Sequence, residues 1–233
     1  MTKAAVVLLA LVGVTMHAQR RVSPPIIVTP DNFNRAETES IYAGGVKSHG
    51  LGSFEHHREP IAIDFHIVRP NRDTLYSLAV FDLDAGPLTV TLPNAGRRFM
   101  SLQVIDEDHY TPHVFYGAGA HTFAKDTIGA RYVSIGVRIL VDPENPKDIQ
   151  QVHALRDAIK VSQPGGPGRF EIPNWDPASQ KKVRDALLAL AATLPDTKRT
   201  FGPRSEVDPV RHLIGTGRSP SAAIPRRTRC ISM

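Results

Sequence analysis

The stretch from residue 131 to residue 141 constrains the fold more than any other part of the chain. Every second residue in it is apolar and β-branched: Val133, Ile135, Val137, Ile139 and Val141. The residues between them include Ser134, Gly136 and Arg138. Because successive side chains of a strand point to opposite faces, this alternation predicts a strand of an antiparallel sheet with one packed face and one wetter face. The chain must therefore bury one side of a β-sheet.

Three more segments have strand patterns. Apolar residues alternate with threonines over residues 88–92 and with Ser101 and Gln103 over residues 100–104, and a turn signal at 93–96 separates the two segments. Residues 75–82 are largely apolar on both faces. A strand of that kind is buried on both sides, so we expect it to lie in the centre of the sheet.

Three segments have helical patterns. The first begins at Thr29-Pro30, a cap followed by proline at the first helical position, and we expect Gly44-Gly45 to end it. The second spans 146–159, and the third starts at Asp176-Pro177 and runs to a stop at Pro195. Strands followed by helices without regular alternation indicate an α+β, β-rich fold with an N-terminal helix and two C-terminal helices.

The first eighteen residues have the pattern of a signal peptide. Lys3 supplies the positive start, residues 4–14 form an uncharged apolar stretch, and a cleavage site fits after Ala18. The apolar stretch is shorter than the ~20 residues that a membrane-spanning helix needs, so no span is expected in the mature chain. We therefore predict a periplasmic or secreted protein in which residues 19–28 form a lead-in to the folded part.

The net charge of +5 is carried by the two ends of the chain. Lys3 lies in the predicted signal peptide, and four arginines lie between residues 217 and 233, where there is no acid. Without these five charges, residues 19–216 have a formal charge of zero. A neutral body lacks the electrostatic attraction that drives binding to phosphate backbones, so no nucleic-acid partner is expected.

The only cysteine, Cys230, also lies in that C-terminal stretch. Thiol catalysis, cysteine-ligated zinc and cysteine-ligated iron–sulfur clusters are therefore excluded for residues 19–216. Nearly 200 residues can bury a core without disulfides. No cofactor is expected.

A polar run leads into the predicted central strand and supplies the first candidate site. Arg72, Asp73 and Tyr76 are candidate catalytic residues that can line an anion or carbonyl pocket, with Asn71 as a candidate ligand-binding residue. Alternatively, Asn71, Asp73 and Thr74 satisfy backbone groups at the strand entry while Arg72 pairs with Asp73. Because no nucleophile and base are visible, the structural interpretation is favoured.

Two other polar runs carry candidates. An acidic run at 106–108 is followed by His109, a candidate catalytic residue, and Asp108 in this run is a candidate ligand-binding residue. The alternative interpretation is an acidic loop without such a role. His56 and His57 are candidate ligand-binding residues. Adjacent histidines share a metal only where the backbone turns sharply, so a hydrogen-bonded junction is favoured and no metal site is expected. Trp175, just before a helix cap, is interpreted as a packing residue.

With these motifs in view, the chain resembles the family called domain of unknown function 1254. The most specific match is Asn71-Arg72-Asp73-Thr74-Leu75-Tyr76-Ser77. The other matching stretches are residues 28–33, 35–38, 56–60, 80–83, 107–110, 173–175 and 208–216. Together they cover roughly residues 27–216.

The resemblance implies a β-sandwich-like domain with helical additions, followed by a jelly-roll-like C-terminal domain of family 1214. It implies no established activity, so it assigns no catalytic residue. We expect the chain to depart from the family after Thr216 and to lack the second domain, because residues 217–233 form an Arg/Pro/Ser-rich tail that we expect to be disordered. A frameshift near this position would explain the tail.

Two classes of function remain open from the sequence. The first is an uncharacterised exported envelope protein that binds a small-molecule ligand or a partner through its β-rich domain. The second is a hydrolase acting on small or envelope-derived substrates, with its site near Arg72, Asp73, Tyr76 and His109. The first is favoured because no complete catalytic set is visible.

Overall fold

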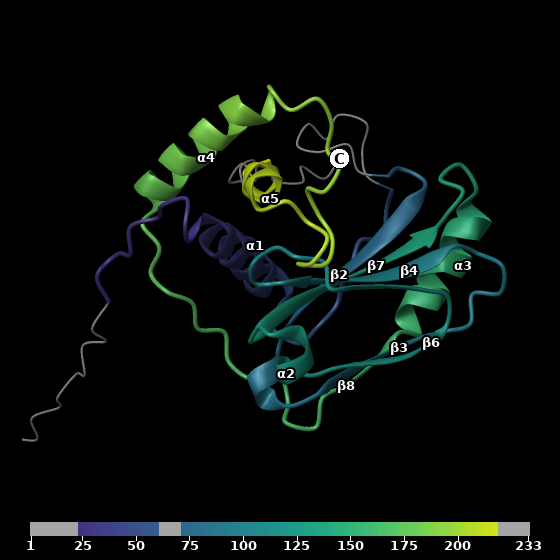
Figure 1. Ribbon diagram of the computed structural model, residues 1–233. Coiled ribbons are helices and arrows are strands. Elements are labelled where there is room, and N and C mark those ends of the chain that lie inside the picture. The colour runs from purple at the N-terminus through teal and green to yellow at the C-terminus, as the bar shows by residue number, and fades with distance from the viewer. Residues whose placement is uncertain (1–22, 61–70, 219–233) are drawn as a thin grey trace, which may run out of the picture.

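A computed structural model describes residues 23–60 and 71–218 and consists of two stacked antiparallel sheets with helices around them (Figure 1). The larger sheet has the strand order β1 (Glu55–His56), β2 (Thr74–Asp82), β7 (Tyr132–Leu140), β4 (Met100–Asp106) and β5 (His113–Tyr116). The smaller sheet has the order β6 (Gly119–Phe123), β3 (Leu88–Leu92) and β8 (Lys160–Ser162). The predicted α+β, β-rich, sandwich-like fold is confirmed.

The core lies between the two sheets. The alternating residues of β7 point into it and are buried, as predicted, and so are those of β3. Each such side chain stabilises the fold by ~1.5–3 kcal/mol relative to an exposed one. The helix α3 (Pro146–Asp157) adds Val152 to this core, and the short helix α2 (Lys125–Ile128) adds Ile128. The strand β2 lies between β1 and β7, inside the sheet as predicted.

The helix α1 (Phe33–His49) differs from the prediction at both ends. It begins after Asn32 rather than at Thr29, because the Asn32 side chain accepts the backbone N–H of Thr29 and forms a turn before the helix. It continues through Gly44-Gly45 to Gly50, where φ is 89°. Gly45 lies next to Val80 of β2, where an added Cβ would make an ordinary contact at 3.8 Å. The packing of α1 on β2, α4 and α5 outweighs the cost of glycine in a helix, about 1 kcal/mol.

The C-terminal part was predicted only in outline. The helix α4 (Pro177–Ala191) is confirmed, with the Asp176 side chain accepting the backbone N–H of Ser179 at 2.8 Å, although it ends before Pro195. The helix α3 ends at Asp157 rather than at residue 159, because the chain turns there to pair β8 with β3. A further helix, α5 (Pro209–Thr216), was not predicted.

The N-terminal segment of the described chain is held against the start of α4. Ile26 forms a parallel β-bridge with Trp175, and its backbone N–H donates to the carbonyl of Asn174 at 2.7 Å. The backbone N–H of Val28 donates to the Ser179 hydroxyl at 2.9 Å, across 151 residues of sequence. The helices α1, α4 and α5 therefore form one group on the side of the larger sheet that faces away from the smaller sheet (Figure 1).

Several predictions fall on parts that the structure does not describe. The predicted signal peptide and residues 219–233 of the predicted tail lie outside the described residues. In the described part, no helix is both long and apolar enough to cross a membrane.

Candidate functional site

The four candidate catalytic residues lie at two ends of the larger sheet. Arg72, Asp73 and Tyr76 are at the start of β2, where Tyr76 pairs with Arg138 of β7. His109 follows the end of β4, where Asp106 pairs with Val133 of β7. Those two positions on β7 are five residues apart, about 17 Å along a strand. The structure therefore does not bring His109 together with the other three residues.

At the start of β2, the structure shows no hydrogen bond from the side chains of Asn71, Asp73 or Thr74 to a described backbone group, and the Thr74 hydroxyl is buried without a partner in the described chain. The Tyr76 hydroxyl accepts the backbone N–H of Asn71 at 3.0 Å, and the Asp73 carbonyl accepts the N–H of Val141 at 2.8 Å. Arg72 and Asp73 are exposed. The described chain contains no ion pair between these two side chains, so that part of the structural interpretation is wrong.

His56 and His57 belong to a hydrogen-bonded junction between β1, β2 and α3. His56 Nδ1 lies 2.7 Å from the Ser77 hydroxyl, and burial and the charge of Arg156 lower the pKa of His56. The His57 carbonyl accepts a hydrogen bond from Arg156, whose guanidinium is buried, and burial lowers the pKa of Arg156 to about 10. Across residues 23–60 and 71–218, no group of three His, Cys, Asp or Glu side chains is placed to hold a metal ion.

The loop after β4 forms an acid–histidine cluster with α1 and α5: Arg35, Glu39, Glu107, Asp108, His109 and His212. Arg35 Nε donates to Asp108 Oδ1 at 2.8 Å, and Arg204 Nη2 donates to the other Asp108 oxygen at 2.9 Å. Burial alone would raise the pKa of Asp108, but these two guanidinium groups hold it below its usual range. Asp108 is therefore fully occupied by protein partners.

His109 has an unusual backbone conformation in this cluster. Its φ is 69°, in the left-handed region that few residues other than glycine adopt. Its Nδ1 lies 2.9 Å from the Thr38 hydroxyl of α1. Burial, followed by the neighbouring His212, lowers the pKa of His109 to about 4. A neutral His109 thus helps to dock α1 onto the loop.

Glu39 connects the cluster to Trp175. Glu39 is buried, and its Oε2 accepts the Trp175 indole N–H at 2.6 Å. Burial and the nearby Glu107 carboxylate raise the pKa of Glu39 to about 7. Trp175 also packs against Phe33 and its neighbours, as predicted for a packing residue. The cluster thus joins α1, the loop after β4, the segment before α4 and α5, which indicates a role in holding the fold together.

The outer face of the larger sheet, which points away from the smaller sheet, has a different character. The helix α1 packs over one end of it, where Tyr42 bonds to the backbone of Ile105 and Ser134. Two cross-strand rows nearer to the start of β2 form what we call the open rows. The first row is Tyr76, Arg138, Ser101 and Tyr116, and the second is Leu78, Gly136, Gln103 and Val114.

The open rows combine exposed apolar groups with polar groups that lack protein partners. Leu78 and Val114 are each 41% exposed and Tyr116 is 69% exposed. Ser101 is fully buried, and within the described residues its hydroxyl has no hydrogen-bond partner. Sequence reasoning placed Arg138 and Gly136 on the wetter face of their strand but did not treat them as a site. An arginine and a glycine on the solvent side of a central strand were the available signal.

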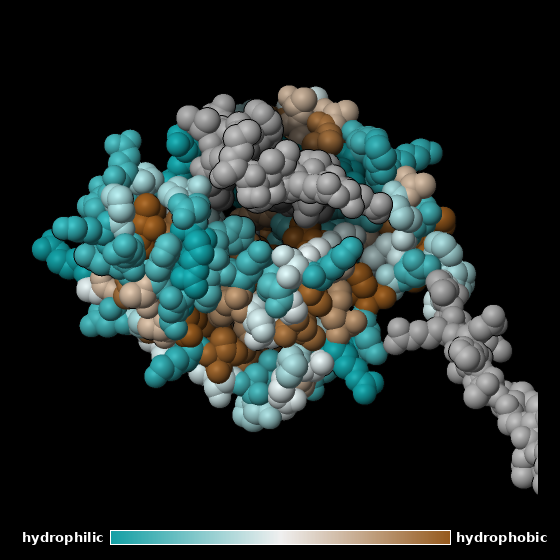
Figure 2. Space-filling model, turned by 180° about the vertical axis from the view of Figure 1, so that it is seen from behind, coloured by the Kyte–Doolittle hydropathy of each residue, from teal (hydrophilic) through white to brown (hydrophobic). Residues whose placement is uncertain are grey.

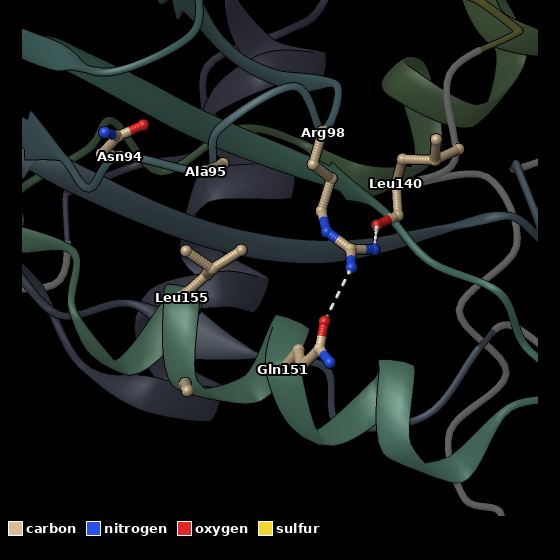
Figure 3. Close-up of a pocket in the computed structure, with 7 residues that line it drawn as sticks. Asn94, Ala95, Arg98, Leu140, Gln151 and Leu155 are labelled. Atoms are coloured by element: carbon tan, nitrogen blue, oxygen red, sulfur yellow. Dashed lines mark hydrogen bonds between the residues drawn. The ribbon is translucent and has the colours of Figure 1, made fainter.

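A hollow lies at one end of the molecule, beside α3. It has a volume of about 690 Å³ and is lined by Asn94, Ala95, Arg98, Leu140, Gln151, Ala154 and Leu155 (Figure 3). The guanidinium of Arg98, the cation that lines this hollow, already has protein partners, because it donates to the Leu140 carbonyl at 2.8 Å and to Asp148 of α3. Arg98 lowers the pKa of Asp148 to about 2. The polar groups of this hollow therefore serve to fix α3.

The surface seen from behind the view of Figure 1 shows small hydrophobic patches among hydrophilic residues, most of them in the lower half of the view (Figure 2). The open rows combine exposed apolar side chains with polar groups that lack partners in the described chain, so they are the candidate surface for a ligand.

The comparisons with known proteins support the family resemblance and the fold, but they name no activity. Residues 51–125 match the model of the family described as "Protein of unknown function (DUF1254)", which confirms the resemblance over that segment. No curated protein matches the chain. The crystal structure of the VPA0106 protein from Vibrio parahaemolyticus has a TM-score of 0.62 at 17% identity and covers 81% of this chain.

The chain spans 64% of the length of that Vibrio structure. An uncharacterized protein from Burkholderia cenocepacia is similar at a TM-score of 0.34 and 10% identity, covering 82% of this chain and 48% of its own. At 17% identity, the likeness to the Vibrio protein shows the fold alone. The function must therefore be argued from the site.

Proposed function

We propose that this chain is an exported, non-catalytic binding protein and that its ligand lies on the open rows of the larger sheet. The observation that carries the proposal is the pair of Arg138 and Ser101, which are directly opposite each other and have no polar partner for their side chains in the described chain. Buried polar groups normally have partners. A surface that keeps one buried hydroxyl and one half-buried cation without partners beside exposed apolar side chains is suited to a ligand.

The shape of the sheet at this point supports the same proposal. Gly136 has no side chain and lies in the middle of the face between Leu78 and Gln103, its neighbours in the second row. A glycine inside a strand often marks a place where a ligand approaches the backbone closely. Such a surface can hold a small molecule without any catalytic group.

The runner-up is a hydrolase with its site near Arg72, Asp73, Tyr76 and His109. The separation of His109 from the start of β2 by about 17 Å weighs against one shared catalytic set, because general acids and bases act within hydrogen-bond reach. Turnover of an ester, amide or glycoside substrate that is lost in Tyr76→Phe or Asp73→Asn would favour this hydrolase over the binding protein.

A fragment screen followed by methyl NMR tests the binding surface. We expect fragments to shift the methyl signals of Leu78 and Val114, at the two ends of the second row, and to leave the methyls of Leu155 in the hollow beside α3 unchanged. Leu155 is a matched control because it lines the competing site. Shifts confined to Leu155, or no shifts anywhere, would contradict the proposal.

Export is supported by the charge and apolar pattern of the first eighteen residues. If it occurs, the protein expressed with its full N-terminus in a Gram-negative host is expected in the periplasmic fraction, with an intact mass that begins at Gln19. Recovery of the uncleaved chain from the cytoplasm would count against export.

A further inference from the structure

We infer that the ligand of the open rows carries an anionic group, a carboxylate or a phosphate, which binds to Arg138 and Ser101. This inference rests on the proposed function and specifies the chemistry of the ligand.

Arg138 is a half-buried cation without a counter-ion. It lies on β7 between β2 and β4, and in residues 23–60 and 71–218 no carboxylate forms an ion pair with it. The acid nearest to it on this face by register is Glu55, which pairs with Leu78 of the second row. Glu55 is engaged elsewhere, because its Oε2 lies 3.0 Å from His49 Nδ1. The positive charge of Arg138 is therefore available to a ligand.

The guanidinium of arginine offers parallel N–H donors whose spacing matches the two oxygens of a carboxylate or phosphate. Such a pair gains strength where water is partly excluded. Arg138 is partly shielded in this way, because it lies in the interior of the sheet with neighbours on both sides. This position favours an anion over a neutral amide or alcohol.

Ser101 supplies a second donor on the same face. It pairs directly with Arg138 across β4 and β7, and residues in that relation have Cβ atoms about 5 Å apart. Its hydroxyl is fully buried and has no hydrogen-bond partner in the described part of the chain. Once a ligand displaces the side chains that cover this hydroxyl, an oxygen of its anionic group would accept a hydrogen bond from it.

Apolar side chains beside these two donors can contact the body of a small ligand. An added Cβ on Gly136 would lie 3.5 Å from Leu78 Cδ2, so Leu78 packs over the bare backbone of Gly136, and it remains 41% exposed. Tyr76 and Tyr116 lie at the two ends of the first row and can contact a planar or apolar body. The ligand that fits best is therefore a small molecule with one anionic end and an apolar body.

Calorimetry on the full chain with three probes at constant ionic strength tests this inference. The probes are benzoate, its neutral isostere benzamide, and inorganic phosphate. We expect benzoate or phosphate to bind and benzamide to bind at least about tenfold more weakly, as removal of a charge-assisted hydrogen bond predicts. Preference for benzoate would indicate a carboxylate ligand, and preference for phosphate would indicate a phosphate ester.

Variants locate the anion. Arg138→Gln is expected to weaken binding by about tenfold or more, and Ser101→Ala by about threefold. Arg97→Gln is the matched control, because Arg97 is exposed outside the open rows and its replacement removes the same charge. If Arg138→Gln does not fold, Arg138→Lys keeps the charge without the paired donors and is expected to retain weakened binding.

The outcomes separate this inference from the proposed function. Equal binding of benzoate and benzamide, or equal loss in the Arg97 and Arg138 variants, would overturn the anionic ligand. If neutral fragments still shift Leu78 and Val114 in that case, the binding surface stands and only the ligand class is wrong. If no probe and no fragment reaches these methyls, the binding function itself is wrong.

Discussion

Replacement of Glu37 by alanine is expected to lower the free energy of unfolding by about 3–5 kcal/mol. The Glu37 side chain is fully buried between α1 and α4 and accepts hydrogen bonds from Arg184 and from Gln180 Nε2, the latter at 2.9 Å. Its removal leaves the largely buried Arg184 guanidinium without a counter-charge, and an unpaired buried charge is costly. Urea denaturation of the purified variant measures the loss.

Two controls separate the buried pair from charge loss in general. The double variant Glu37→Met/Arg184→Met removes both charges and is expected to be much closer to the native protein than Glu37→Ala. Asp185→Ala breaks the exposed pair with Lys181 on the same helix and is expected to cost about 0.5 kcal/mol or less. A Glu37→Ala loss no larger than that of Asp185→Ala would show that the buried pair is not needed.

The second large effect concerns the pH dependence of stability, where Glu39 and His109 act in opposite directions. The pKa of Glu39 rises from 4.5 to about 7 in the fold, so between these values the folded protein holds a proton that the unfolded chain has released. Stability from Glu39 therefore falls as the pH rises through this window. The pKa of His109 falls from 6.5 to about 4, so stability from His109 falls as the pH drops through that window.

Single substitutions are expected to remove the contribution of each residue to the pH dependence of stability. Glu39→Gln stays neutral and can still accept the Trp175 N–H, so relative to the native protein it should gain about 2–3 kcal/mol between pH 4.5 and pH 8. His109→Asn tolerates the left-handed backbone and should gain about 1–3 kcal/mol relative to the native protein as the pH falls from 6.5 to 4. Differences from the native protein cancel the other shifted groups, Asp106 and Asp108.

Urea unfolding at several pH values gives both differences, with Glu59→Gln as the control because Glu59 is exposed. Trp175 is the only tryptophan, so its fluorescence in the folded protein also reports on Glu39. A fluorescence transition near pH 7 is expected in the native protein and not in Glu39→Gln. The same pH profile for the native protein and all three variants would refute the assignment.

The sheet could be predicted from the sequence because its strands have a clear two-residue period. Strands β3, β4 and β7 can be predicted from their own residues, because the alternation of apolar and polar side chains in each strand shows which face is buried. The ends of α1 could not be predicted in this way. Gly44-Gly45 is a typical helix end, and the helix continues because α1 packs on β2, α4 and α5, contacts that the local sequence does not show. The short helix α5 is also stabilised mainly by its packing on α4 and α1.

The sites were harder to predict than the fold, because they depend on register and on long-range contacts. Four of the stretches that resemble the family, at Arg35, Glu107 to Tyr110, Trp175 and His212, lie far apart in the sequence and meet in the acid–histidine cluster. Ser101 and Arg138 are likewise opposite each other only because β4 and β7 pair in one particular register. Neither arrangement is visible in a linear pattern.

The link between Ile26 and the residues before α4 also bears on when the chain can fold. The N-terminal segment and α1 rest on partners that follow about 150 residues later, such as Ser179 for Val28. A growing chain therefore cannot complete this packing until α4 has been synthesised, and closing so long a loop slows folding. We expect the N-terminal segment and α1 to remain accessible to proteases and chaperones until late in synthesis and then to pack in a single step.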